Sequence, residues 1–292
     1  MRIRATVAAV TGALALSALV IPAAQADAQG GVSLDRPSAA ERFGTPSAKS
    51  GFSTAAAAFT FSNVSVNANK NVVVGTTAAK TFTVSLTASH ASGIADAYID
   101  LWHGTSVDSD FDGWLPPNEE AAKCTVVNTT TSSCKLTITA TPGFNTEDGI
   151  GDLYANALAG NWHVTVGALS NDGEIYWNDF YKTQKVQRLS KLTVNAAPEP
   201  VKKGKTITVT GKLTRADWQT GKYAGVSGQS VGLQFRKASS STYTSVKGIK
   251  STTGGALKTT VKASVDGYHR FSYKGITSTA TVTTAGDYVD VK

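Results

Sequence analysis

The chain has 292 residues with 28 Lys and Arg, 21 Asp and Glu, two cysteines and a formal net charge of +7. This length allows two domains of ordinary size, each with its own hydrophobic core. Neither cysteine has a further Cys or a His at ligand spacing, which excludes a cysteine zinc site and a catalytic cysteine.

The N-terminus has the pattern of an export signal. Two arginines in the first four residues precede an apolar run that extends to about Pro22, and Ala24-Gln25-Ala26 supplies a small-x-small cleavage site. We predict a signal peptide over residues 1–26, a secreted, extracellular chain that begins at Asp27, and no membrane span in the mature chain. A retained membrane anchor is the alternative, against which the short apolar run and the cleavage site both argue.

Charge is distributed unevenly along the rest of the chain. Residues 27–190 contain 10 Lys and Arg against 16 Asp and Glu, a net charge of −6, whereas residues 191–292 contain 16 against 5, a net charge of +11. Two modules of opposite sign are therefore expected, an acidic one over residues 59–190 and a basic one over residues 191–292.

Residues 27–58, which precede the acidic module, are rich in Ala, Ser, Gly and Pro. They show no sustained period of 2 or 3.6 residues, so this segment is not expected to bury enough apolar surface to offset the entropy lost on ordering. We predict a flexible leader over this range.

From Phe59 to Ser190 the sequence consists of short runs rich in Val, Thr, Ile and aromatic residues, separated by Gly, Asn, Asp and Ser. Residues 81–87 alternate polar and apolar side chains, as a half-buried strand does. Asn171-Asp172-Gly173 predicts a tight hairpin, since glycine accepts the positive φ that such turns need. Residues 117–122 and 150–158 are the candidates for short helices. Seven or more short strands predict a β-sandwich.

The stretch from Asp108 to Glu119 fits the twelve-residue calcium-loop pattern, with acidic residues at positions 1, 3, 5 and 12 and Gly113 at position 6. Pro116-Pro117 and the strand-like residues before the loop argue against the helix pair of an EF-hand. We predict a structural Ca²⁺ site on a sandwich, and a solvated acidic turn is the alternative. The predicted ligands are Asp108, Asp110, Asp112, the Trp114 carbonyl and Glu119.

Cys124 and Cys134 are the two cysteines of the chain. An exported chain meets an oxidising environment, so we predict a disulfide between them. On the chain-entropy model, closing a loop of this length stabilises the fold by roughly 2.5–3 kcal/mol.

Residues 191–292 alternate more regularly than the acidic module. Within residues 205–213, Ile207, Val209 and Leu213 are predicted to be buried while Lys and Thr face water. A second sandwich is therefore expected, and the complete prediction is an all-β chain with two immunoglobulin-like β-sandwich domains in tandem after a signal peptide and flexible leader.

Four stretches of the basic module carry a family resemblance: Lys191–Asn195, Pro198–Lys205, Gly211–Thr214 and Gly228–Val231. They resemble the bacterial immunoglobulin-like modules of secreted actinomycete proteins. Most of residues 60–292 is similar to a two-module family of such exported proteins, which has no established activity and some of whose members are labelled calcium-binding. The resemblance implies the sandwich architecture and no catalytic residues.

Enzymatic and sugar-binding functions are alternatives. None of the four histidines lies in a metalloprotease pattern or beside a Ser or Cys nucleophile motif, and no Gly-x-Ser-x-Gly occurs. A carboxylate pair at glycosidase spacing stays open, because that separation is a three-dimensional quantity. Trp114, Trp177, Tyr181 and Trp218 are candidates for stacking on sugars, with core packing as the alternative.

We therefore expect a secreted, non-catalytic binding or structural protein with a structural calcium site in the first domain. The alternatives are a cell-wall polymer or carbohydrate-binding module and a secreted hydrolase. An anionic cell-wall polymer or polysaccharide is the partner that the basic module suggests, in preference to nucleic acid. Solvated strand faces carry the same basic residues, which is the alternative to any such partner.

Overall fold

The computed structural model describes residues 36–44, 52–53, 58–145 and 149–292. The predicted signal peptide and most of the predicted leader lie outside these residues. Within the described ranges, no helix is both long enough and apolar enough to cross a membrane.

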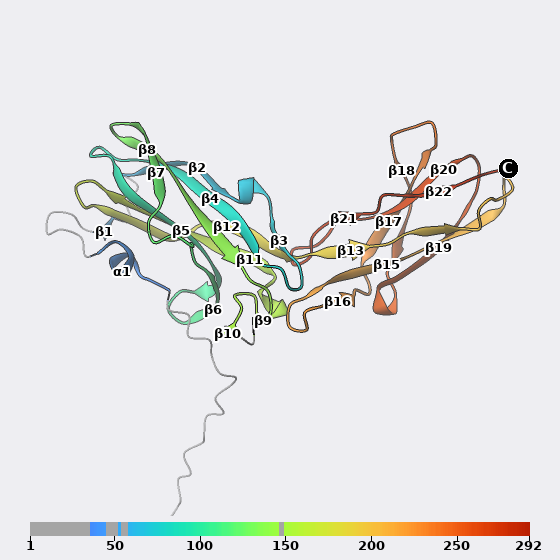
Figure 1. Ribbon diagram of the computed structural model, residues 1–292, viewed down its shortest axis with the longest axis horizontal. Helices are drawn as coiled ribbons and strands as arrows, with labels where there is room; N and C mark the ends of the chain where they lie inside the picture. The colour runs from blue at the N-terminus through green and yellow to red at the C-terminus, as the bar shows by residue number, and fades with distance from the viewer. Residues whose placement is uncertain (1–35, 45–51, 54–57, 146–148) are drawn as a thin grey trace, which may run out of the picture. The chain divides into compact units, whose positions relative to one another are not determined.

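The fold is all-β, as the alternating sequence predicts, and consists of two immunoglobulin-like sandwiches in tandem along the chain (Figure 1). In the first sandwich, one sheet has the strand order β1-β12-β11-β5-β6 with β3 beside β12, and the other has the order β2-β4-β8-β7. A small hairpin, β9 with β10, stands apart from these sheets. The strands are β1 (Phe52–Ser53), β2 (Thr60–Val66), β3 (Val72–Val74), β4 (Lys80–Ser89), β5 (Ile94–Ser106), β6 (Asp110–Leu115), β7 (Lys123–Asn128), β8 (Thr131–Ala140), β9 (Phe144–Asn145), β10 (Gly149–Ile150), β11 (Gly160–Ser170) and β12 (Ile175–Arg188).

The second sandwich also has two sheets. In one, β15 pairs with β13, β14, β16 and β19, and in the other β18-β17-β20-β21 are neighbours in that order with β22 also beside β20. The strands are β13 (Ser190–Leu192), β14 (Asn195–Ala197), β15 (Thr206–Asp217), β16 (Lys222–Gly225), β17 (Ser230–Lys237), β18 (Thr244–Lys250), β19 (Ala256–Lys262), β20 (Gly267–Tyr273), β21 (Val282–Thr283) and β22 (Asp287–Val289).

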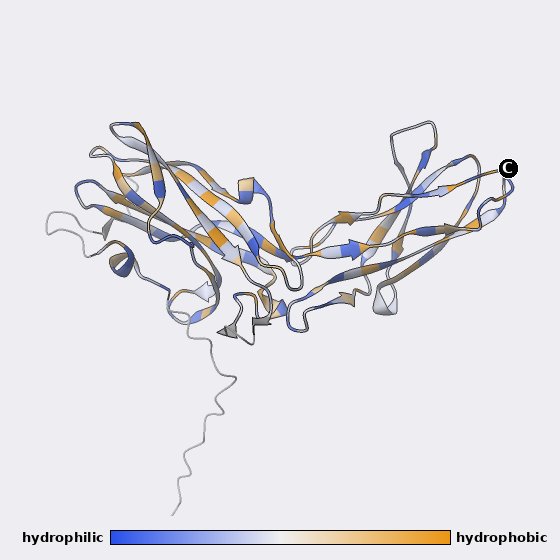
Figure 2. Ribbon diagram, in the orientation of Figure 1, coloured by the Kyte–Doolittle hydropathy of each residue, from blue (hydrophilic) through white to orange (hydrophobic). Residues whose placement is uncertain are grey.

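Side chains that alternate along the strands build the two hydrophobic cores. In β4, Phe82, Val84 and Leu86 are all buried, whereas the residues between them are exposed or half-buried. In β15, Ile207 and Val209 are completely buried. Figure 2 shows this alternation of hydrophobic and hydrophilic residues along the strands. Burial of one face per strand is what holds each pair of sheets together.

The structure contains the predicted hairpin turn but not the predicted short α-helices. The hairpin at Asn171–Gly173 is confirmed, because β11 and β12 pair antiparallel across it and the φ of Gly173 is 88°. Residues 117–122 contain no helix, since Pro117 forms a β-bridge with Ile138 instead. Within residues 150–158, the one helical segment is a short 3-10 turn, η2 (Asn156–Leu158). Two further 3-10 turns are η1 (Asn67–Asn69) and η3 (Thr253–Gly255).

Residues 36–44 depart from the flexible leader predicted over residues 27–58. Ser38 caps the helix α1 (Ala39–Phe43), and Glu41 completes a capping box with it. Arg36 and Arg42 form ion pairs with the first sandwich. The partners of these arginines lie 54 or more positions further along the chain, so no local period in the sequence reveals the contacts.

The predicted disulfide is confirmed. Cys124 of β7 and Cys134 of β8 are opposite one another in the antiparallel register and are bonded, with their Cα atoms 4.0 Å apart. Cys134 is buried in the core, so the bond ties the edge strand β7 to the centre of its sheet.

Replacing both Cys124 and Cys134 by serine should lower the free energy of unfolding by roughly 2–3 kcal/mol, because the unfolded chain regains the entropy of the opened loop. Urea denaturation of the wild-type and double-variant chains measures this. A reducing agent should bring the wild type to the stability of the variant and leave the variant unchanged. Equal stabilities of the oxidised wild type and the variant would contradict the assignment.

Candidate functional site

The predicted calcium loop forms part of a β-hairpin. β5 and β6 pair antiparallel, with Asp110 opposite Ser106, and Asp108 lies in the turn between the strands. Asp110 and Asp112 therefore lie on a strand, and the register between β5 and β6 is interrupted at Asp112, which has no partner residue on β5. This extended backbone replaces the turning loop that the calcium pattern implies.

The two aspartates on β6 each have their own partner. Thr105 donates a hydrogen bond to the carboxylate of Asp110, and a carboxylate oxygen of Asp112 contacts Nδ1 of His103. Among the described residues, the predicted aspartates are not part of any group of three His, Cys, Asp or Glu side chains within metal-binding distance.

Glu119, the predicted closing ligand, is engaged elsewhere. One carboxylate oxygen of Glu119 accepts a hydrogen bond from the backbone N–H of Thr137 at 2.7 Å, and the other accepts one from the Thr137 hydroxyl at 2.7 Å. Trp114, the predicted backbone ligand, directs its indole N–H to Asp100. The structure therefore distributes the predicted ligands over separate contacts, and calcium binding stays a prediction.

A different set of charges meets in the first sandwich, on the face of β5, β11 and β12 that points away from the core. Asp100 is completely buried, and its carboxylate accepts a hydrogen bond from Nε of Arg36 at 2.8 Å. Nη2 of Arg36 lies 2.6 Å from the carboxylate of Asp179 and also contacts the hydroxyl of Thr165. The Arg36 side chain is itself only 8% exposed. We call Arg36, Asp100, Thr165 and Asp179 the arginine clamp.

Aromatic side chains complete the surroundings of the arginine clamp. Asp100 accepts hydrogen bonds from the Tyr98 hydroxyl and the Trp114 indole N–H, each at 2.9 Å, and Asp179 accepts one from the Trp177 indole N–H at 2.9 Å. Burial and the Asp100 charge raise the pKa of Tyr98 far above its ordinary value, so this hydroxyl is a permanent donor. The carboxylates are thus saturated with donors.

Arg36 remains charged in this setting. Burial alone would lower its pKa, but the neighbouring carboxylates of Asp100 and Asp179 outweigh burial and raise the pKa above its ordinary value. Arg42 adds a second ion pair, 2.8 Å from Asp96, and thereby fixes the other end of α1 to β5.

The arginine clamp bears on the glycosidase alternative. Asp100 and Asp179 are one carboxylate pair that the fold brings together, and both accept hydrogen bonds from the same guanidinium. A glycosidase needs two carboxylates open to a sugar and to water. The buried position of Asp100 under residues 36–44 makes this pair a structural feature.

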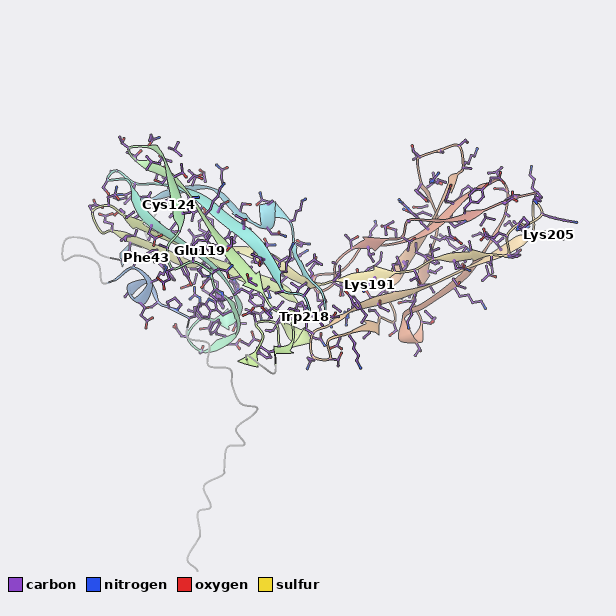
Figure 3. All side chains as sticks on the ribbon, in the orientation of Figure 1. Phe43, Glu119, Cys124, Lys191, Lys205 and Trp218 are labelled. Atoms are coloured by element: carbon purple, nitrogen blue, oxygen red, sulfur yellow. A yellow bond between two sulfur atoms is a disulfide. The ribbon has the colours of Figure 1, made fainter. Side chains whose placement is uncertain are left out.

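Of the four aromatic side chains considered for sugar stacking, Trp218 and Tyr181 pack with the core. Trp114 and Trp177 are half-buried beside the arginine clamp, to which their indole N–H groups donate hydrogen bonds. Trp218, which is labelled in Figure 3, is fully buried. Trp177 stacks on Tyr98 with ring centroids 4.9 Å apart, and Phe43 meets its edge. Tyr181 packs edge-on against Phe61. These rings serve packing and hydrogen bonding rather than forming an exposed row.

The fold also assembles His90, Asp172 and Glu174, a group that the sequence analysis did not identify. Nε2 of His90 lies 3.0 Å from Glu174, and its Nδ1 accepts a hydrogen bond from the backbone N–H of Ser92. The Ser92 hydroxyl in turn donates to Asp172 at 2.7 Å. Each potential ligand is therefore already hydrogen-bonded, and the network joins the β4–β5 turn to the β11–β12 turn.

The second sandwich carries basic side chains with few acidic partners. Residues 190–292 are all described, and within them a single ion pair occurs at 4.0 Å or less, between Lys292 and Asp290. The remaining Lys and Arg side chains of this sandwich have no carboxylate within that distance among the described residues. Its net charge of +11 is therefore not neutralised internally.

No protein-family model and no curated protein matches the sequence. Three solved structures illustrate what the chain is similar to. The D00-D0 domain of intimin is 16% identical over 77% of this chain and 98% of that one, with a TM-score of 0.24. The Escherichia coli adhesin FdeC is 17% identical over 80% and 64%, with a TM-score of 0.28. A titin fragment is 11% identical over 80% and 67%, with a TM-score of 0.25. These likenesses are too distant to indicate a function.

Replacing Arg36 by methionine should lower the free energy of unfolding by about 3–5 kcal/mol, because it leaves the buried Asp100 carboxylate without its cation. Adding Asp100→Asn to this variant should restore part of the loss. Urea denaturation measures both, and Lys70→Met at an exposed position is the control, with an expected change below about 0.5 kcal/mol. A loss below about 1 kcal/mol in Arg36→Met would contradict the role of the arginine clamp.

The calcium prediction is tested by melting. For calcium to bind, Glu119 has to release Thr137 and Asp112 has to release His103, so affinity should be no better than the roughly 10⁻⁴–10⁻³ M of extracellular modules. Millimolar calcium should raise the melting temperature of the wild type and of the neighbouring control Glu120→Ala, but not of Asp110→Ala. Identical wild-type melts in calcium and in chelator would remove the prediction.

Proposed function

We propose that the protein is exported and acts as a non-catalytic binding protein, which attaches to an anionic polymer outside the cell through its basic second sandwich. The carrying observation is the uncompensated charge of that sandwich, where 16 Lys and Arg face 5 Asp and Glu. Such a surface concentrates polyanions and releases their counterions on binding.

The first sandwich supports this proposal as a rigid structural unit. Its disulfide fits an oxidising compartment, and the arginine clamp and Arg42 hold residues 36–44 on its sheet. Arg36 occupies the Asp100–Asp179 carboxylate pair, and Asp172 and Glu174 share a hydrogen-bond network with His90. A binding role therefore accounts for more of the molecule than a hydrolytic one.

Binding of the purified chain to immobilised polygalacturonate tests the proposal, with immobilised dextran as the neutral control. We expect retention on the anionic polymer alone, with an affinity that falls roughly tenfold between about 50 and 200 mM salt as two or three contacts are screened. Failure to bind polygalacturonate, polyphosphate or any other polyanion at low salt would overturn the function.

A further inference from the structure

The outer face of the sheet formed by β17, β18, β20 and β22 gathers arginine and tyrosine side chains. The register sets Gln234 opposite Arg270, Arg236 opposite Tyr268, and Tyr268 opposite Tyr288. Leu233 and Phe271, one position away from Gln234 and Arg270, are buried in the core. Alternation along the strands therefore places these side chains on the solvent side. We call Gln234, Arg236, Tyr243, Tyr268, Arg270 and Tyr288 the arginine–tyrosine face.

Tyrosine rings hold both guanidinium groups in place. The Cζ atom of Arg236 lies 3.8 Å from the ring centroid of Tyr268 and 5.4 Å from that of Tyr243. The Cζ atom of Arg270 lies 3.7 Å from the Tyr243 centroid. Stacking of a guanidinium on a ring covers its flat face and leaves its N–H edges free for planar, bidentate recognition. Both arginines are thus ordered before any ligand arrives.

Hydrogen bonds use only part of each guanidinium. Nε of Arg270 donates to Gln234 at 2.7 Å, and Nη1 of Arg236 donates to the Ser240 carbonyl at 2.8 Å. Among the described residues, neither arginine has a carboxylate within ion-pair distance. Arg270 therefore retains the edge formed by its two Nη atoms, and Arg236 retains the edge formed by Nε and Nη2. Each edge matches the two oxygens of one carboxylate.

The opposite end of the face has a different chemistry. Tyr288 is 39% exposed, and its ring centroid lies 5.1 Å from that of Tyr268. Removal from water and the nearby carboxylates of Asp266 and Asp290 raise the pKa of Tyr288 above its ordinary value. This end thus offers an aromatic surface beside hydrogen-bond acceptors, a combination that suits the hydroxyls of a sugar ring.

We propose that the arginine–tyrosine face binds carboxylate-bearing sugars, the uronic acid residues of an acidic polysaccharide. The sugar carboxylates pair with the free edges of Arg236 and Arg270, and a neighbouring sugar ring packs on Tyr288 with its hydroxyls toward the acidic end. This inference rests on the proposed function and assigns it a ligand class and a site. A polyphosphate lacks the hydroxyl-bearing rings that the second half of the face accommodates.

Titration calorimetry of the full chain with oligogalacturonate of four to six units tests the site. Arg236→Lys with Arg270→Lys keeps both charges but removes both bidentate edges, and should weaken binding by at least about tenfold. Lys258→Gln with Lys262→Gln removes two charges from β19 in the opposite sheet and should change affinity less than about twofold. Thermal melts of both double variants establish that each is folded.

Further arms separate the ligand chemistries. Tyr288→Ala should weaken oligogalacturonate binding several-fold and leave binding of inorganic polyphosphate of equal charge unchanged. Equal affinity of the arginine-to-lysine variant and the wild type for oligogalacturonate would overturn the site while leaving the proposed function intact. Tighter binding of polyphosphate than of oligogalacturonate would overturn the ligand class. Absence of all polyanion binding by the wild type would overturn both.

Discussion

The first sandwich depends on the burial of one charge, the carboxylate of Asp100. A buried carboxylate without a cation costs several kcal/mol, and here the cation comes from Arg36, which lies before the first strand of the sandwich. The ion pair therefore makes residues 36–44 part of the folded unit. It also closes the Asp100–Asp179 carboxylate pair, because Arg36 binds both side chains.

The arginines of the second sandwich are held in a different way. Arg236 and Arg270 are half-buried, so water still solvates their charges and no carboxylate partner is needed. Tyrosine rings, instead of carboxylates, hold the two guanidinium groups in place. In the first sandwich Arg36 and Arg42 are paired with carboxylates of the protein, whereas Arg236 and Arg270 have no carboxylate within ion-pair distance among the described residues. On the proposed function, the first module gives structural support and the second binds the ligand.

The sequence predicts what depends on local periodicity. Alternation locates the core strands, as Phe82, Val84 and Leu86 of β4 illustrate, and the two cysteines define their own disulfide. It does not predict the pairing of Arg36 with Asp100 or of His90 with Glu174, whose partners are 64 and 84 positions apart with no spacing rule to connect them. The acidic loop shows that a motif can match in sequence without its usual backbone. Asp110 and Asp112 fit the calcium-loop pattern, but they lie on a strand that pairs with β5. Tertiary hydrogen bonds also engage the predicted ligands separately, as the two from Thr137 to Glu119 do.

We propose that binding is confined to one face of the second sandwich. Hydrogen–deuterium exchange of the full chain with and without oligogalacturonate tests this proposal, since it locates the ligand without altering the protein. We expect slower exchange in residues 234–247 and 268–290, and no change in residues 96–103, 175–182 and 256–262. Protection centred on the first sandwich, or on β19 in the opposite sheet, would contradict it.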